Sequence, residues 1–229
     1  DIVRTLSEWC VAGLERSSVL LCVDAPLGWP RRLPIALGNH TAGRAVRDEA
    51  NGIFRRYTDR AIAKRVGKTP LDVGADRIAR AAHATLGRLE TVGNEVHRMT
   101  GVEITLPLAA EPIAWTALEQ SDNRPAFNLL ETYPAGWFVS EGIDSSGYRP
   151  RQARDKRNEL LRNALAAAGS SYAVEIVGNG DGEAFTARAD DLDALVCLFC
   201  GMDVLLVRSP GPSIEFVETA RIEGWIWCK

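Results

Sequence analysis

Two short apolar runs define the strand pattern of the chain. Residues 19–23 read Val-Leu-Leu-Cys-Val, and residues 126–133 read Ala-Phe-Asn-Leu-Leu-Glu-Thr-Tyr. Runs of this length and composition predict strands that are buried on both faces, as in a parallel sheet. Pro26 and Pro134 prevent either run from continuing as a central strand. The pattern therefore predicts the interior of an α/β sheet.

Helical spacing of apolar residues surrounds these strands. It predicts one buried helix face in each of five segments, 1–16, 57–66, 72–97, the stretch ending at Gly169, and 189–201. The 72–97 helix is expected to be interrupted near Gly87 or Gly93. The weaker signals predict a loop over 29–41, a short strand at 102–106, a helical turn at 112–119, and a closing strand or edge at 222–227.

Composition adds limits on class and partners. The chain has 229 residues, 46% hydrophobic and 25% charged, which predicts a single domain (1–229) with a helical insertion around 44–120. Its net charge of −3 gives no general attraction to nucleic acid or membranes. No apolar run reaches the ~20 residues that span a bilayer, and the first residues show no signal-peptide pattern. An odd number of cysteines, five, favours reduced thiols and a cytoplasmic protein.

Carboxylates stand at the end of both predicted strands. Asp24 follows the first run directly, and Glu131 lies near the end of the second. Ligands of open α/β sheets bind beyond the carboxyl ends of the strands, so both residues are candidates for a site. The alternative for Asp24 is a local role, in which its side chain organises the following turn.

A third acidic group opens the predicted helix 189–201. Asp190 and Asp193 are three residues apart, so both carboxylates are expected to point the same way, while small Ala194 would let the helix approach a sheet. The alternative is helix capping by acidic residues of the first turn. A cap needs only one Asp, and with Asp191 the three acids repel one another unless a cation lies between them.

These acidic groups together favour a hard divalent cation, Mg²⁺ or Mn²⁺, which prefers oxygen ligands. Such sites commonly serve phosphoryl chemistry. Two basic stretches, 44–68 and 148–162, would supply phosphate contacts, although solvated helix faces explain them equally well. Cys197 and Cys200 lie in an apolar helix and are expected in the core, as are Trp225 and Trp227.

Five short motifs follow one another in an order that resembles the DUF429 family, predicted nucleases with an RNase H-like fold. They are Val-Asp-Ala-Pro-Leu-Gly-Trp-Pro (23–30), Arg-Tyr-Thr-Asp (56–59), Glu-Thr-Tyr-Pro (131–134), Asp-Asp-Leu-Asp-Ala (190–194) and Glu-Gly-Trp-Ile-Trp (223–227). The resemblance implies a mixed sheet with flanking helices and a carboxylate cluster for a divalent metal. The Asp-x-x-Asp-Ala spacing also resembles Holliday-junction resolvases. In that fold three antiparallel strands come first, and the first of them brings a catalytic Asp. They would precede residue 1, and that Asp is not found in this sequence.

The leading hypothesis is a metal-dependent nuclease or phosphodiesterase that acts on nucleic acid. The expected metal ligands and catalytic residues are Asp24, Glu131, Asp190 and Asp193. Arg56 is expected to contact a phosphate, Asp59 to hold Arg56 or another basic group, and Lys156 and Arg157 to grip the nucleic-acid backbone. Oligomeric state is left open.

Two other hypotheses remain at this point. One is a non-catalytic binding or scaffold protein, in which each carboxylate is buried against its own Arg or Lys. The other is small-molecule phosphoryl transfer, since the RNase H-like fold also hosts sugar and acetate kinases. The sequence contains no Gly-rich phosphate-binding loop, which counts against the second.

Overall fold

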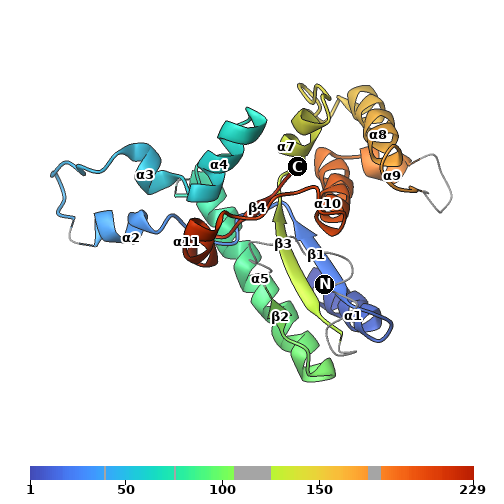
Figure 1. Cartoon of the computed structure of the whole chain (residues 1–229), viewed down its shortest axis with the longest axis horizontal. Coiled ribbons are helices and arrows are strands. Elements are labelled where there is room, and N and C mark those ends of the chain that lie inside the picture. The colour runs from blue at the N-terminus through green and yellow to red at the C-terminus, as the bar shows by residue number, and fades with distance from the viewer. Residues whose placement is uncertain (39, 75, 106–124, 175–181) are drawn as a thin grey trace.

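The computed structural model describes residues 1–38, 40–74, 76–105, 125–174 and 182–229, and these form a mixed α/β structure (Figure 1). The strands are β1 (Val19–Val23), β2 (Ile104–Thr105), β3 (Phe127–Thr132) and β4 (Ile226–Trp227). The helices are α1 (Ile2–Leu14), α2 (Arg32–Leu37), α3 (Ala50–Phe54), α4 (Tyr57–Val66), α5 (Asp76–Thr100), α7 (Pro134–Ser140), α8 (Arg154–Gly169), α9 (Glu183–Thr186), α10 (Ala189–Leu205) and α11 (Val217–Glu223). A 3-10 turn at Ile214–Phe216 precedes α11.

The strands of the described chain form a small open sheet in which every pairing is parallel. β3 lies at its centre and pairs with the whole of β1, from Val19 opposite Phe127 to Val23 opposite Glu131. β2 and β4 pair with the beginning and the end of β3. The carboxyl ends of β1 and β3 therefore lie side by side, and Asp24 follows directly.

The two faces of the sheet pack against different helices, because successive side chains of a strand point to opposite faces. Val19, Leu21 and Phe127 pack with residues of α1 and α5 in one core cluster. Leu20, Cys22 and Leu130 belong to a second cluster, which includes Val204 of α10 and both tryptophans of the 223–227 motif. The sheet is thus the middle layer between α1 with α5 and α10, and this period-two division follows from strand geometry.

The main elements confirm the hydrophobic pattern. Both predicted strands are present, and all six residues of β3 are buried. The predicted helix at 57–66 is α4, and the helices predicted at 1–16 and before Gly169 are α1 and α8. The weak strands at 102–106 and 222–227 correspond to β2 and β4. The turn predicted at 112–119 lies outside the described residues.

Three local predictions were wrong. The segment 29–41 contains the short helix α2. Helix α5 continues through both of its glycines, and Gly93 has a packing reason, because a Cβ there would lie 2.9 Å from the Ile104 side chain. Ala194 is exposed and does not face the sheet. Gly201 makes the close approach instead, since its Cβ would lie 2.5 Å from Cys22 Sγ.

Thiols and tryptophans behave as the sequence predicts. All five cysteines are free, and the two in α10 are buried. Trp225 and Trp227 are 4% and 1% exposed, which places them in the core. Among the described helices none combines the length and the hydropathy that a membrane crossing requires.

Candidate functional site

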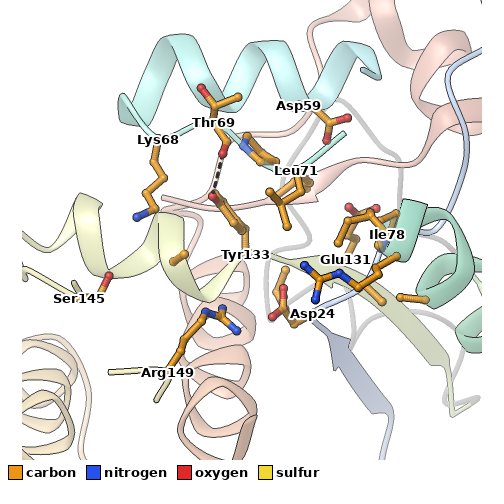
Figure 2. Close-up of a pocket in the computed structure, with 18 of the residues that line it drawn as sticks. Asp24, Asp59, Lys68, Thr69, Leu71, Ile78, Glu131, Tyr133, Ser145 and Arg149 are labelled. Atoms are coloured by element: carbon orange, nitrogen blue, oxygen red, sulfur yellow. Dashed lines mark hydrogen bonds between the residues drawn. The ribbon is translucent and has the colours of Figure 1, made fainter. Parts of the chain in front are cut away.

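A pocket of about 740 Å³ opens where β1 and β3 end. Its floor includes Asp24 and Glu131 from the two strand ends (Figure 2). One wall comes from the segments after α4 and at the start of α5, with Leu71 and Ile78 as apolar residues. The opposite wall is the 145–150 loop, which ends in Arg149 and Pro150. The pocket therefore lies at the sheet edge where α/β proteins bind ligands.

Asp24 is the carboxylate that this pocket presents to a ligand. Asp24 is exposed, and no hydrogen-bond partner contacts it within the described chain. The surrounding walls still remove much of its hydration. Burial raises the pKa of Asp24 to about 7, helped by the negative charges of Asp193, Glu131 and Asp190 and opposed by Arg149. Asp24 therefore exchanges a proton near neutral pH.

Glu131 has a different environment, because its carboxylate is already paired. Arg56 donates to both of its oxygens, at 2.7 Å from Nη1 and 2.5 Å from Nη2. The backbone N–H of Leu27 donates to the first of these oxygens at 2.9 Å. With 3% exposure, Glu131 is a buried ion-pair partner and not an open metal ligand.

The Arg-Tyr-Thr-Asp motif explains how Arg56 reaches this position. Asp59 accepts from the Arg56 backbone N–H at 2.8 Å and forms a capping box at the start of α4. The same carboxylate accepts from Arg56 Nε and Nη2, so it also orients the guanidinium toward Glu131. Burial alone would lower the pKa of Arg56, but the carboxylates of Glu131 and Asp59 raise it above its usual value. Arg56 is a structural cation and is not available to a phosphate.

Strand alternation separates the two carboxylates that end neighbouring strands. Glu131 lies four residues after Phe127, so its side chain is on the same face of the sheet, away from α10. Leu20 and Cys22 are on the other face, toward α10. Asp24 follows Cys22 by two residues and so continues the face toward α10. Asp193 of α10 is the charged group that affects the pKa of Asp24 most. The sequence brings both residues to one edge, and side-chain direction then gives them different partners.

The acidic start of α10 divides in the same way. Asp193 is 4% exposed, accepts from the Tyr148 hydroxyl at 2.6 Å and lies 3.3 Å from Arg149. Burial raises the pKa of Asp193, while Tyr148 and Arg149 oppose the rise. Asp190 is exposed, and its negative charge contributes to the raised pKa of both Asp24 and Asp193. Asp191 caps α10 and pairs with Arg188 at 2.8 Å.

These contacts decide how far the four expected ligands suit a divalent cation. Glu131 does not fit, since Arg56 neutralises it. Asp24, Asp190 and Asp193 have the carboxylate oxygens that such a cation prefers, and the raised pKa of Asp24 comes first from burial and then from the neighbouring negative charges. In the part of the chain that the structure describes, no group of three acidic, His or Cys side chains is placed to hold a metal.

The basic residues expected on the nucleic-acid backbone have local roles. Arg157 is 1% exposed and donates only to backbone carbonyls, so the expectation that it grips a ligand was wrong. Its acceptors are the carbonyls of Tyr148, Pro150, Arg151, Thr186 and Ala187. These bonds tie α8 to the 148–151 loop and to the end of α9. Lys156 pairs with Glu159 at 3.2 Å on the surface of α8.

Several pocket residues were not singled out in the sequence. Arg149 and Asp24 face one another across the pocket, and Lys68 and Tyr133 line its other side (Figure 2). The Tyr133 hydroxyl donates to the Thr69 carbonyl at 3.3 Å. Their only sequence signal is proximity to recognised motifs, because Tyr133 follows Glu131 and Arg149 lies in the second basic stretch.

Comparison with known proteins identifies the family. The chain belongs to the DUF429 family, described as proteins of unknown function, whose model matches residues 1–211. This match confirms the family resemblance carried by the motifs. No curated protein and no solved structure matches the chain.

Proposed function

We propose that this protein hydrolyses phosphodiester bonds in nucleic acid at the pocket that Asp24 faces. The observation that carries the proposal is Asp24 itself, a carboxylate with a pKa of about 7, without a hydrogen-bond partner in the described chain, on the floor of a 740 Å³ pocket. Structural carboxylates are usually paired, whereas a strongly raised pKa in a pocket is typical of acid–base groups.

The chemistry assigned to Asp24 is proton transfer. In its ionised form it takes a proton from the water that attacks phosphorus, and in its protonated form it returns a proton to the leaving oxygen. Arg149 and Lys68 supply positive charge for the phosphate oxygens. Arg149 is 61% exposed and paired with Asp193 only on one side, so its guanidinium keeps donors for a ligand.

A divalent metal, Mg²⁺ or Mn²⁺, belongs to the same proposal, with three of the four expected carboxylates. Asp24 in its ionised form would bind it together with Asp190 and Asp193, and these side chains would have to move closer to one another, because the described residues contain no ready three-ligand group. When bound, the cation would supply Lewis-acid stabilisation of the phosphoryl oxygens. Tyr148 would orient Asp193, and Arg56 would keep Glu131 out of the ligand set.

An RNase H-like fold is the finer fold assignment that accompanies this function. The parallel β1–β3 pair with carboxylates at its end, and an acidic helix packed on one face, support it. The assignment is an argument from fold-level analogy, and the function rests on the pocket.

The decisive experiment measures hydrolysis of single-stranded and duplex DNA and RNA with MnCl₂, in wild type and Asp24→Asn. We expect cleavage that the substitution abolishes and that Asp191→Asn, a matched surface carboxylate variant, preserves. A parallel thermal titration with MnCl₂ is expected to raise the midpoint in wild type but not in Asp24→Asn. Equal cleavage by wild type and Asp24→Asn, or no cleavage of any of these substrates by wild type, would contradict the proposal.

A non-catalytic binding or scaffold protein is the second candidate, favoured by the Arg56 network. Glu131 and Asp59 share one buried arginine, and Asp193 is satisfied by Tyr148. This arrangement is what a structural acidic network requires. The Mn²⁺ titration separates the two candidates, because a scaffold predicts no midpoint shift in wild type.

A further inference from the structure

The segment between β1 and α4 forms an arm that projects from the body of the protein (Figure 1). We define the arm as residues 31–38 and 40–52. Helix α2 contains no buried residue, and every residue of 40–51 is exposed. Helices α2 and α3 contact one another within the arm. Binding residues are often carried by surface connections of this kind, which makes the arm a candidate for contact with a ligand.

The arm is anchored firmly at both ends by one residue. Glu223, which is 6% exposed, accepts from the backbone N–H of Arg31 at 2.7 Å and from that of Tyr57 at 2.5 Å. Gly28 packs against the same helix end, where a Cβ would lie 2.6–2.8 Å from backbone atoms of Ile222 and Glu223. These contacts hold the two roots of the arm together.

The arm is connected along the chain to two residues of the candidate site. Asp24 precedes the arm and Arg56 follows it, and both line the pocket. No residue of the arm itself lines the pocket, so only a ligand that is long compared with a single phosphodiester could contact both.

The arm carries four arginines against two acids, Asp48 and Glu49, which are exposed near its end. Residues 25–47 contain no Asp or Glu, while Arg31, Arg32, Arg44 and Arg47 are all exposed. None of these four guanidinium groups has a hydrogen bond or ion pair within the described chain. Elsewhere on the surface, arginines such as Arg98 and Arg188 pair with acids three residues away. Unpaired arginines grouped on one projecting segment are suited to an anionic polymer.

We infer that the arm binds the phosphate backbone of a nucleic acid whose reacting phosphate lies in the pocket. The inference rests on the proposed function, which places one phosphate of the nucleic acid in the pocket. It adds that phosphates further along the same strand bind to the arm. The overall charge of −3 does not oppose this, because the four arginines of the arm outnumber Asp48 and Glu49 and leave it with a net charge of +2.

The test compares Arg44→Gln/Arg47→Gln with Arg88→Gln/Arg162→Gln, a control that removes two exposed arginines from α5 and α8. Binding of a labelled single-stranded DNA oligonucleotide is measured by fluorescence anisotropy between 50 and 200 mM NaCl. Loss of two phosphate contacts should lower the slope of log K against log salt by about 1.4. Over this range wild type should then lose about sevenfold more affinity than the arm variant. The control should retain the wild-type slope.

Hydrolysis of a small diester, bis(4-nitrophenyl) phosphate, separates the two proposals because this compound is too small to reach the arm. Equal rates in wild type and the arm variant, with weaker DNA binding by the variant, are expected. Unchanged DNA binding and salt slope in the arm variant would overturn the inference. So would binding to anionic phosphatidylserine vesicles without DNA binding, or an arm-dependent dimer with unchanged DNA binding. Absence of hydrolysis in wild type, with arm-dependent DNA binding, would overturn the proposed activity alone.

Discussion

Replacing Asp24 with Asn should change how the stability of the protein depends on pH. The carboxylate has a pKa of about 7 in the folded chain against an ordinary value of 3.8. The folded state therefore holds a proton that the unfolded state has released between these values. Wild-type stability should fall as pH rises from about 4 to 7, and Asp24→Asn should remove this fall.

The size of the effect follows from the shift and from the openness of the pocket. About three pKa units at about 1.4 kcal/mol each set an upper bound of about 4 kcal/mol. Asp24 is exposed to solvent, which screens its interactions and makes this bound far too large. We therefore expect Asp24→Asn to raise the free energy of unfolding by about 1–2 kcal/mol at pH 8, and by little at pH 4.

Urea denaturation of both proteins between pH 4 and pH 8 measures this difference directly. Asp191→Asn is the control with the opposite sign, because the hydrogen bond from Arg188 lowers the pKa of Asp191. That variant should lose stability at pH 8 and approach wild type as pH falls. Parallel curves for wild type and Asp24→Asn would refute the reasoning, since Asp24 would then titrate as an ordinary carboxylate.

Three further perturbations test the surrounding network. Arg56→Met leaves two buried carboxylates without their cation and should cost about 3–5 kcal/mol in urea denaturation, and a loss below about 1 kcal/mol would contradict the buried ion pair. Gly224→Ala should destabilise by about 1–3 kcal/mol from backbone strain at φ 81°, ψ 169°, and further because its Cβ would lie 3.0 Å from the paired glutamate. Gly142→Ala is the control, because Gly142 also has a positive φ of 70° but open space around it. An equal drop in melting temperature for both variants would show that contact with Glu131 adds nothing to the backbone strain at Gly224. Tyr148→Phe removes a hydrogen bond that lowers the pKa of Asp193, so that pKa should rise in a carboxyl ¹³C NMR titration, and an unchanged value would show that the hydroxyl does not act on it.

The sequence by itself determined the parts of the fold that depend on short-range pattern. Apolar runs give β1 and β3, and the prolines that follow them mark where they end. Helical periodicity gives α1, α4 and α8 within a few residues. These features are readable because burial and backbone hydrogen bonding repeat with the period of each element. The family also followed from motif order alone.

Only the tertiary structure decided what each carboxylate does. Asp24 and Glu131 look equivalent in the sequence, since each lies at the end of a buried strand. Their side chains lie on opposite faces of the sheet. Glu131 therefore binds Arg56, 75 residues away in the chain, and Asp24 lies near Asp193 of α10 in the pocket. The same holds for Arg157, which reads as a surface cation but is enclosed by backbone carbonyls. Local pattern specifies which residues are buried or turned, whereas the partner of a buried charge depends on segments far apart in the chain, and only the folded arrangement brings those together.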